Sequence, residues 1–172
     1  MKKFWKNTKP IDEEKELDDL LEFELVSQNI VPVKIERLDP HAIIPTYAHA
    51  DDACCDVYII EDYTLRKNQR LLLRTGIAIE IPTGYEVQLR PRSGLAWKHG
   101  LTLVNAPGTI DAQYRNEVKL LVINLGKSSI GLRRGDRVAQ MCIKPVYTMD
   151  FTEVGKLSDS DRGLGGWGST GK

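Results

Sequence analysis

The chain has 172 residues, with 24 Lys and Arg against 24 Asp and Glu, so its formal net charge is zero. That length suits one domain with an extension, and a neutral chain lacks the electrostatic footprint of a general nucleic-acid binder. It has no run of about 18 apolar residues, which a membrane span requires, and its basic start is followed by the acidic stretch Asp12–Glu16 where a signal peptide would be apolar. We therefore expect a soluble, cytoplasmic protein with no nucleic-acid or membrane partner, although a local group of arginines and backbone N–H groups could still bind an anion.

The cysteine pattern agrees with that location. Cys54 and Cys55 are adjacent, and a disulfide between neighbours would be strained, so reduced thiols are the simplest state. His49 lies near them in the sequence, but no second pair of Cys or His at ligand spacing completes a tetrahedral site. The pattern therefore predicts small strand residues and not a metal centre.

Residues 1–30 are predicted to be an N-terminal helical extension. Between Pro10 and about Val26, three leucines share one face, the proline suits a first helical turn, and acids crowd the start. The apolar stripe is too narrow for independent folding. We expect the helix to pack on the domain or on a neighbouring subunit; the alternative is an arm that binds another protein.

From Val31 the pattern changes to short runs of β-forming residues separated by turns. Many short strands with no helix between them predict an all-β antiparallel sandwich or barrel. The barrel is placed at residues 31–158, and the glycine-rich residues 159–172 are predicted to be a flexible C-terminal arm. The predicted strands cover residues 31–38, 56–60, 70–75, 77–81, 85–90, 101–104, 117–124 and 137–146.

The glycine-rich arm contains the dinucleotide pattern G-x-G-x-x-G at residues 163–168. The sequence that follows is too short for the helix that this fingerprint needs, so that interpretation fails. Arg162, Ser169 and Thr170 are nevertheless phosphate-binding residue types, and the indole of Trp167 could stack on a flat ring. A disordered linker with one stray aromatic is the alternative.

Three further clusters could bind or act on an anion. Residues 91–96 leave a strand with Arg, Ser and Gly, a composition suited to an anion nest. Residues 105–115 form a hairpin-like excursion with one acid, Asp111, which taken alone is more often a turn residue than a base. Residues 134–140 are a turn that feeds a strand, and their ordinary interpretation is solvated charge.

Taken in order, these clusters resemble the five motifs of the trimeric deoxyuridine triphosphatase (dUTPase) family. Residues 91–96 match P-R-S-G-L-A outright, and residues 135–140 match G-D-R-I-A-Q with Val for Ile. The resemblance covers about residues 31–172. The other three motifs are matched less closely. Residues 53–57 are similar to A-G-Y-D-L, residues 108–117 to G-x-I-D-x-D-Y-R-G-E, and residues 162–171 to R-G-x-G-G-F-G-S-T-G.

The resemblance implies a β jelly-roll homotrimer with active sites at subunit interfaces, which hydrolyses dUTP to dUMP and pyrophosphate with Mg²⁺. Such an enzyme keeps uracil out of DNA and supplies dUMP for dTMP synthesis. By motif match, Asp111 would be the general base for the attacking water. The Mg²⁺ would be held chiefly by triphosphate oxygens and waters, with Asp56 contacting it through water. Tyr114 would pack against the deoxyribose and leave no space for a 2′-hydroxyl.

The same motif matches imply three further sets of substrate-binding residues. The uracil edge would be read by Asn105 and the hairpin backbone at Gly108, Thr109 and Ile110, with Lys119 also lining the uridine pocket. Phosphates would be bound, from a neighbouring chain, by Arg92, Ser93, Gly94 and Gln140. The arm would close over the substrate through Trp167 on uracil, Arg162 on the γ-phosphate, Ser169 and Thr170 on the phosphate chain, and the adjoining Gly166 and Gly168.

Several positions depart from the family pattern. Cys54 and Cys55 replace a glycine and an aromatic beside Asp56, while Gln113 replaces an acid and Asn116 a glycine in the hairpin; Trp167 replaces Phe and enlarges the stacking surface. Two alternatives follow. One is a dCTP deaminase-like enzyme, whose catalytic glutamate stands in a T-L-E segment that is absent from this strand. The other is a non-catalytic dUTPase-like regulator that binds a protein partner through the N-terminal extension.

Overall fold

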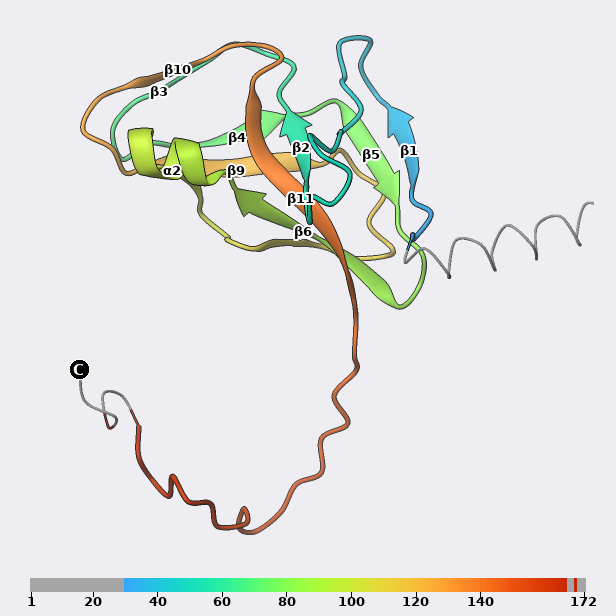
Figure 1. Ribbon diagram of the computed structural model, residues 1–172, viewed down its shortest axis with the longest axis vertical. Coiled ribbons are helices and arrows are strands. Elements are labelled where there is room, and N and C mark those ends of the chain that lie inside the picture. Colours follow the sequence, from blue (N-terminus) through green and yellow to red (C-terminus); the bar gives the residue numbers. More distant parts are fainter. Residues whose placement is uncertain (1–29, 167–168, 170–172) are drawn as a thin grey trace, which may run out of the picture.

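The computed structural model describes residues 30–166 and residue 169. Within them the chain forms an all-β body of small antiparallel sheets, from which the C-terminal segment runs away as an extended strand-free tail (Figure 1). The predicted fold class is confirmed. The elements are β1 (Lys34–Arg37), β2 (Cys55–Tyr58), β3 (Tyr63–Leu65), β4 (Arg70–Arg74), β5 (Ile77–Glu80), β6 (Tyr85–Pro91), α2 (Ser93–His99), β7 (Leu101–Leu103), β8 (Gly108–Ile110), β9 (Lys119–Asn124), β10 (Ile130–Leu132) and β11 (Arg137–Pro145).

The long strand β11 organises the sheet that carries most of the predicted site. This sheet has the order β2-β11-β6-β8, and each neighbouring pair is antiparallel. A bulge between Arg137 and Ala139 shifts the register of β11 against β2. The other sheets in the described residues have the orders β4-β9-β7, β1-β5 and β10-β3. Because β11 pairs on both sides, it brings β2 close to the end of β6.

Alternating apolar residues of these sheets meet in one core. On β9, Leu120 and Val122 are fully buried, and on β6, Val87 and Leu89 are nearly so. Full burial of such a side chain stabilises a fold by roughly 1.5–3 kcal/mol. The strands are therefore held in a fixed register, and the loops that leave their ends start from fixed positions.

The expectation that no helix interrupts the strands is wrong, because α2 follows β6 directly. This helix is only seven residues long and buries none of its side chains, so it has no apolar periodicity to reveal it. It ends at Gly100, whose φ of 70° is left-handed and whose N–H caps the last turn on the carbonyls of Ala96 and Leu95. The sequence did carry that stop signal, a glycine after Lys98 and His99.

Three short strands were also missed, and two predicted strands begin later than expected, β1 at Lys34 and not at Val31, and β9. The missed strands β3, β8 and β10 have three residues each, too few to show alternation. Strand β9 starts at Lys119 and not at Glu117. The cause is local, because the N–H of Val118 donates to the carbonyl of Ile77 at 2.8 Å and so pairs with the start of β5 instead of β4.

The helix predicted near the N-terminus and the arm predicted at the C-terminus both stay predictions. The expected helix at residues 10–26 lies outside the described residues. Beyond Pro145 the described chain has no strand, and Figure 1 shows it leaving the body. Its apolar side chains are exposed, among them Tyr147 at 87% and Phe151 at 82%. The division between a barrel ending at residue 158 and an arm from residue 159 is therefore not visible as a change of structure.

Candidate functional site

A cavity of about 330 Å³ lies where the end of β6 meets β11. The pairing of β6 with β11 sets Pro91 opposite Ala139 and Arg90 opposite Gln140, so residues that are far apart in sequence converge there. Cation and hydrogen-bond donors dominate the lining, which suits an anion. The lining residues are Arg92, Ser93, Gly94, Leu95, Lys98, His99 and Gln140.

Behind this cavity, Asp56 holds two arginines. Its buried carboxylate lies 3.1 Å from Nε of Arg92 and 3.0 Å from Nη1 of Arg137. Oδ2 accepts a hydrogen bond from Arg137, whereas Oδ1 is buried without an aligned donor, so its contact with Arg92 is an ion pair and not a hydrogen bond. The cluster carries a net charge of +1, which favours a bound anion.

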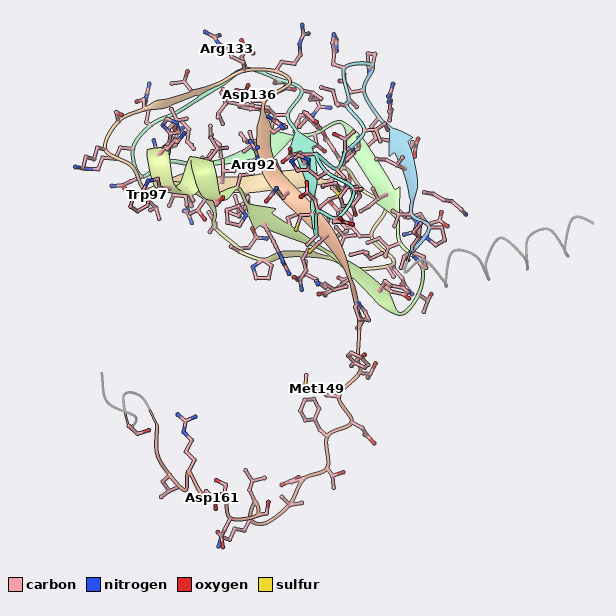
Figure 2. All side chains as sticks on the ribbon, viewed as in Figure 1. Arg92, Trp97, Arg133, Asp136, Met149 and Asp161 are labelled. Atoms are coloured by element: carbon pink, nitrogen blue, oxygen red, sulfur yellow. The ribbon has the colours of Figure 1, made fainter. Side chains whose placement is uncertain are left out.

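The position of Asp56 follows from strand register. Asp56 on β2 stands opposite Gln140 on β11, so the carboxylate, the glutamine and the end of β6 share one region of the sheet. Arg92 also donates from Nη1 to the carbonyl of Arg137 at 2.9 Å. Figure 2 shows the labelled Arg92 between α2 and the β2–β11 pair. The guanidinium of Arg92 is therefore fixed by two contacts before any ligand binds.

Gly94 lies beside open space at the edge of the cavity. A Cβ built there meets no atom within 4 Å, so the protein itself leaves this space free. Ser93 and Gly94 are both exposed, and they begin the short helix α2. A ligand could approach the backbone at this point as closely as glycine permits.

The second group of predicted residues lies on the excursion between β7 and β9. Strand β8 pairs with β6 and buries Gly108 and Ile110, while Thr109 is exposed. A Cβ on Gly108 would stand 3.2 Å from Nδ2 of Asn105, so the asparagine side chain lies close over the glycine. The backbone of β8 and the Asn105 amide thus lie close together.

The predicted base and the predicted sugar-binding ring follow β8 in one turn. The N–H of Tyr114 donates to the carbonyl of Asp111 at 3.0 Å. The Tyr114 hydroxyl donates to the carbonyl of Glu117 at 2.9 Å, and 41% of the tyrosine remains exposed. Asp111 is exposed, and Lys119 Nζ lies 3.7 Å from Oε2 of Glu117.

One chain does not bring all the predicted residues together. Arg92, Ser93, Gly94 and Gln140 line the cavity, but the hairpin residues, including Asp111 and Tyr114, are not among its lining residues. The part of the arm that the structure describes, residues 159–166 and 169, lies apart from the body that carries both groups (Figure 1). Within the arm, Nε of Arg162 donates to the carbonyl of Gly165 at 2.9 Å and the N–H of Ser169 to that of Gly166 at 3.1 Å. The predictions for Trp167, Gly168 and Thr170 lie outside the described residues.

Three participants were not predicted from the sequence. Lys98 and His99 line the cavity because α2 turns them toward it, and Arg137 pairs with Asp56 through strand register. Recognition of the helix would have found the first two, since residues four apart on a helix, such as Gly94 and Lys98, share a face. The sequence offered no signal for the Asp56–Arg137 pair.

Cys55 lies on β2 and Cys142 on β11, and burial suppresses the ionisation of both thiols. Burial raises the pKa of Cys55 to about 11, and burial with the neighbouring Cys54 raises that of Cys142. In the described part of the chain, no three His, Cys, Asp or Glu side chains converge on a point that could hold a metal ion. Nor is any helix there long and apolar enough to cross a membrane.

Comparison with known proteins gives consistent matches along the chain. A family profile described as dUTPase matches residues 40–171. A deoxyuridine 5'-triphosphate nucleotidohydrolase of Clostridioides difficile is 49% identical over 139 residues, which is 81% of this chain and 97% of that protein. One from Thermobifida fusca is 52% identical over 142 residues, covering 82% of this chain and 79% of that one.

A similar fold is found among solved structures. The dUTPase of Staphylococcus bacteriophage 80alpha, solved with dUPNHPP, superposes with a TM-score of 0.77 at 26% identity, over 82% of this chain and 99% of that chain. A dUTPase mutant from phage phi11 of S. aureus, whose structure is described as coordinating a structural Mg(II) ion, superposes with a TM-score of 0.68 at 23% identity over 73% of this chain and 97% of that one. The second likeness concerns the fold alone.

Proposed function

The chain belongs to the dUTPase family, and from that membership we propose how its residues carry out the family's reaction. The protein is a dUTP diphosphatase that hydrolyses dUTP to dUMP and pyrophosphate. One observation carries the assignment of its phosphate site. Arg92, Ser93, Gly94 and Gln140, from separate motifs, line a single cavity backed by the Asp56 cluster. This cavity binds the triphosphate.

The proposed general base is Asp111. It is exposed, and within residues 30–166 no hydrogen bond or ion pair engages its carboxylate, so both oxygens are available to a water molecule. A turn closed by the hydrogen bond from the N–H of Tyr114 to the carbonyl of Asp111 places Tyr114 three residues further on, where its half-exposed ring can pack against the deoxyribose. Asp111 takes a proton from the water that attacks the α-phosphorus, and such a base adds about 10²–10⁴-fold to the rate.

Mg²⁺ is proposed to enter with the nucleotide. A cluster with a net charge of +1 does not attract a free cation, and the described residues offer no preformed cage of acids. Mg²⁺ prefers to keep phosphate oxygens and waters as its ligands, so it does not need a preformed cage of protein carboxylates. Asp56 would contact the ion through water; its Oδ1 lacks a hydrogen-bond donor but is buried beside Arg92, so that contact requires the oxygen to be uncovered when the nucleotide binds. When bound, the ion neutralises charge on the triphosphate.

The site is proposed to be completed between chains of a homotrimer. Two observations support this. The phosphate cavity and the Asp111–Tyr114 turn are separate in one chain, and the tail exposes Tyr147, Met149 and Phe151, which are large apolar side chains that water does not favour. Figure 2 shows Met149 on the tail away from the body. In the trimer the arm, with Arg162 and Ser169, closes over the nucleotide.

The substitution Asp111→Asn tests the assignment of the base. We expect it to bind dUTP normally and to turn over at least ~10²-fold more slowly, because the amide cannot accept the proton. Binding of a non-hydrolysable dUTP analogue is measured beside kcat, and Asp150→Asn, an exposed acid on the tail, serves as the control. Turnover of Asp111→Asn close to that of the wild type would refute the role of Asp111.

A further inference from the structure

Glu117 is a buried acid that the proposed mechanism does not use. It is 7% exposed. Its Oε1 accepts a hydrogen bond from the N–H of Gly76 at 2.9 Å. Nε of Arg74 donates to both carboxylate oxygens, at 3.2 Å to Oε1 and at 3.3 Å to Oε2. A buried charge with this many donors is held in one place, because each lost partner would leave a polar group unsatisfied.

The carboxylate joins the base of the site hairpin to the corner between β4 and β5. The adjoining residue, Val118, donates its N–H to the carbonyl of Ile77 at 2.8 Å and accepts a hydrogen bond from the Thr75 hydroxyl. Gly76 at this corner has φ of +68°, and a Cβ there would stand 2.9 Å from Cβ of Asp39. The donor that faces Glu117 therefore belongs to a tightly fixed piece of backbone.

From this anchor a direct contact leads to the predicted sugar-binding residue. The Tyr114 hydroxyl donates to the backbone carbonyl of Glu117 at 2.9 Å. The N–H of Tyr114 in turn donates to the carbonyl of Asp111. Glu117 therefore makes both contacts: its side chain is anchored at Gly76, and its backbone carbonyl orients the Tyr114 ring.

We infer that Glu117 is a positioning residue for sugar discrimination: by fixing its own backbone to the β4–β5 corner, it holds Tyr114 where the ring excludes a ribose 2′-hydroxyl. This rests on the proposed role of Tyr114. Glu117 acts through Tyr114 and touches no reacting atom. When the Glu117 anchor is weakened, the Tyr114 ring can shift and leave space for the 2′-hydroxyl of UTP.

A carboxylate is needed at this position and an amide is not equivalent. Gly76 N–H and the Arg74 guanidinium are both donors, and two acceptor oxygens satisfy them. Gln at this position has one acceptor oxygen and would turn an NH₂ group toward a donor. The substitution Glu117→Gln therefore keeps the size of the side chain while it weakens the anchor.

A matched control is available on the same arginine. Glu61 accepts from Nη1 of Arg74 at 2.9 Å, but its side chain is 45% exposed and it contacts the Tyr63 hydroxyl instead of the hairpin. Glu61→Gln thus removes one charge beside Arg74 without touching the anchor of Tyr114. Its ratio of kcat/KM for dUTP to kcat/KM for UTP is expected to equal that of the wild type.

The experiment measures that ratio for the wild type, E117Q, Y114F, their double variant and E61Q. We expect E117Q and Y114F each to lower it by about 2–10-fold, the equivalent of one hydrogen bond. The double variant should fall no further than the lower single variant, because both changes break one link. A fall in kcat that is equal for dUTP and UTP, with the ratio unchanged, would mean that Glu117 is merely structural and would overturn the inference.

Two additional variants settle the remaining outcomes. If E117Q does not fold, Arg74→Lys removes the guanidinium and keeps the Glu117–Gly76 contact; it should lower the ratio in the same direction, and an unchanged ratio would overturn the inference. Tyr114→Ala separates the two proposals. If it leaves the ratio unchanged, the role of Tyr114 itself fails, whereas a lowered ratio in Tyr114→Ala with an unchanged one in E117Q defeats only the role of Glu117.

Discussion

Replacing Asp56 with Asn should destabilise the protein measurably. The substitution keeps the size of the side chain but removes the charge that stands between Arg92 and Arg137, at 3.1 Å and 3.0 Å from their nitrogens. Two guanidinium groups then face each other with no acid between them. Breaking a fully buried ion pair costs about 3–5 kcal/mol.

The structure sets the expected loss below that range. The Asp56 side chain is 6% exposed, but those of Arg92 and Arg137 are 28% and 48% exposed and keep part of their hydration. Asn can also still accept one hydrogen bond. We therefore expect a loss of about 2 kcal/mol, which for a chain of this size lowers Tm by about 4–8 °C.

The assay is thermal unfolding at fixed protein concentration, since the stability of an oligomer depends on it. Asp62→Asn is the control, because Asp62 also pairs with an arginine at 3.0 Å but is 59% exposed. Exposed pairs contribute little and are screened by salt. A structural role of the buried Asp56 pair is excluded if Asp56→Asn unfolds within about 1 °C of the wild type, or if high salt abolishes the effect of the substitution as it would for a surface pair.

Three further changes test other parts of the structure. Asn124→Ala should cost about 2–3 kcal/mol in chemical denaturation, because the fully buried amide bonds the backbone of Leu65, Gly126 and Ser128, and those groups would lose their partner. A loss below about 1 kcal/mol would show that water replaces it. Cys55, with its pKa raised to about 11, should be alkylated slowly at neutral pH and progressively faster as pH rises toward that value, because only the thiolate reacts; mass spectrometry of peptides follows this, and modification at pH 7 as fast as that of a free thiol would contradict it. Truncation after Asp161 should abolish most dUTP turnover and leave the oligomer intact in light scattering, whereas dissociation to monomers would show that the arm is structural.

The fold could be predicted from the sequence where strands are long enough to alternate. Strands β6 and β11 were found within one residue of their ends, since β6 buries Val87 and Leu89 in alternation and the long β11 buries four of its residues. Helix α2 was not predicted because it buries none of its side chains, and β8 was not predicted because it has only three residues. Periodicity is a signal of burial, so it does not report elements that lie at the surface or are very short.

The site was predictable as a set of residues but not as an arrangement. The motifs named Arg92 and Gln140, and the structure places both on one cavity because β6 pairs with β11. The ion pair of Asp56 with Arg137 and the anchor of Glu117 on Gly76 depend on strand register and on a corner in the backbone. Such contacts join residues that no local pattern connects, so only the structure reveals them.

The decisive measurement is pyrophosphate release from dUTP, UTP, dTTP and dCTP, made in parallel with Mg²⁺ and with a chelator. We predict release from dUTP alone and its loss on chelation, which would establish the substrate, the sugar discrimination and the metal requirement together. Release of ammonia from dCTP would instead favour the deaminase. No release from any nucleotide would contradict the proposed activity and leave the motifs as a binding scaffold.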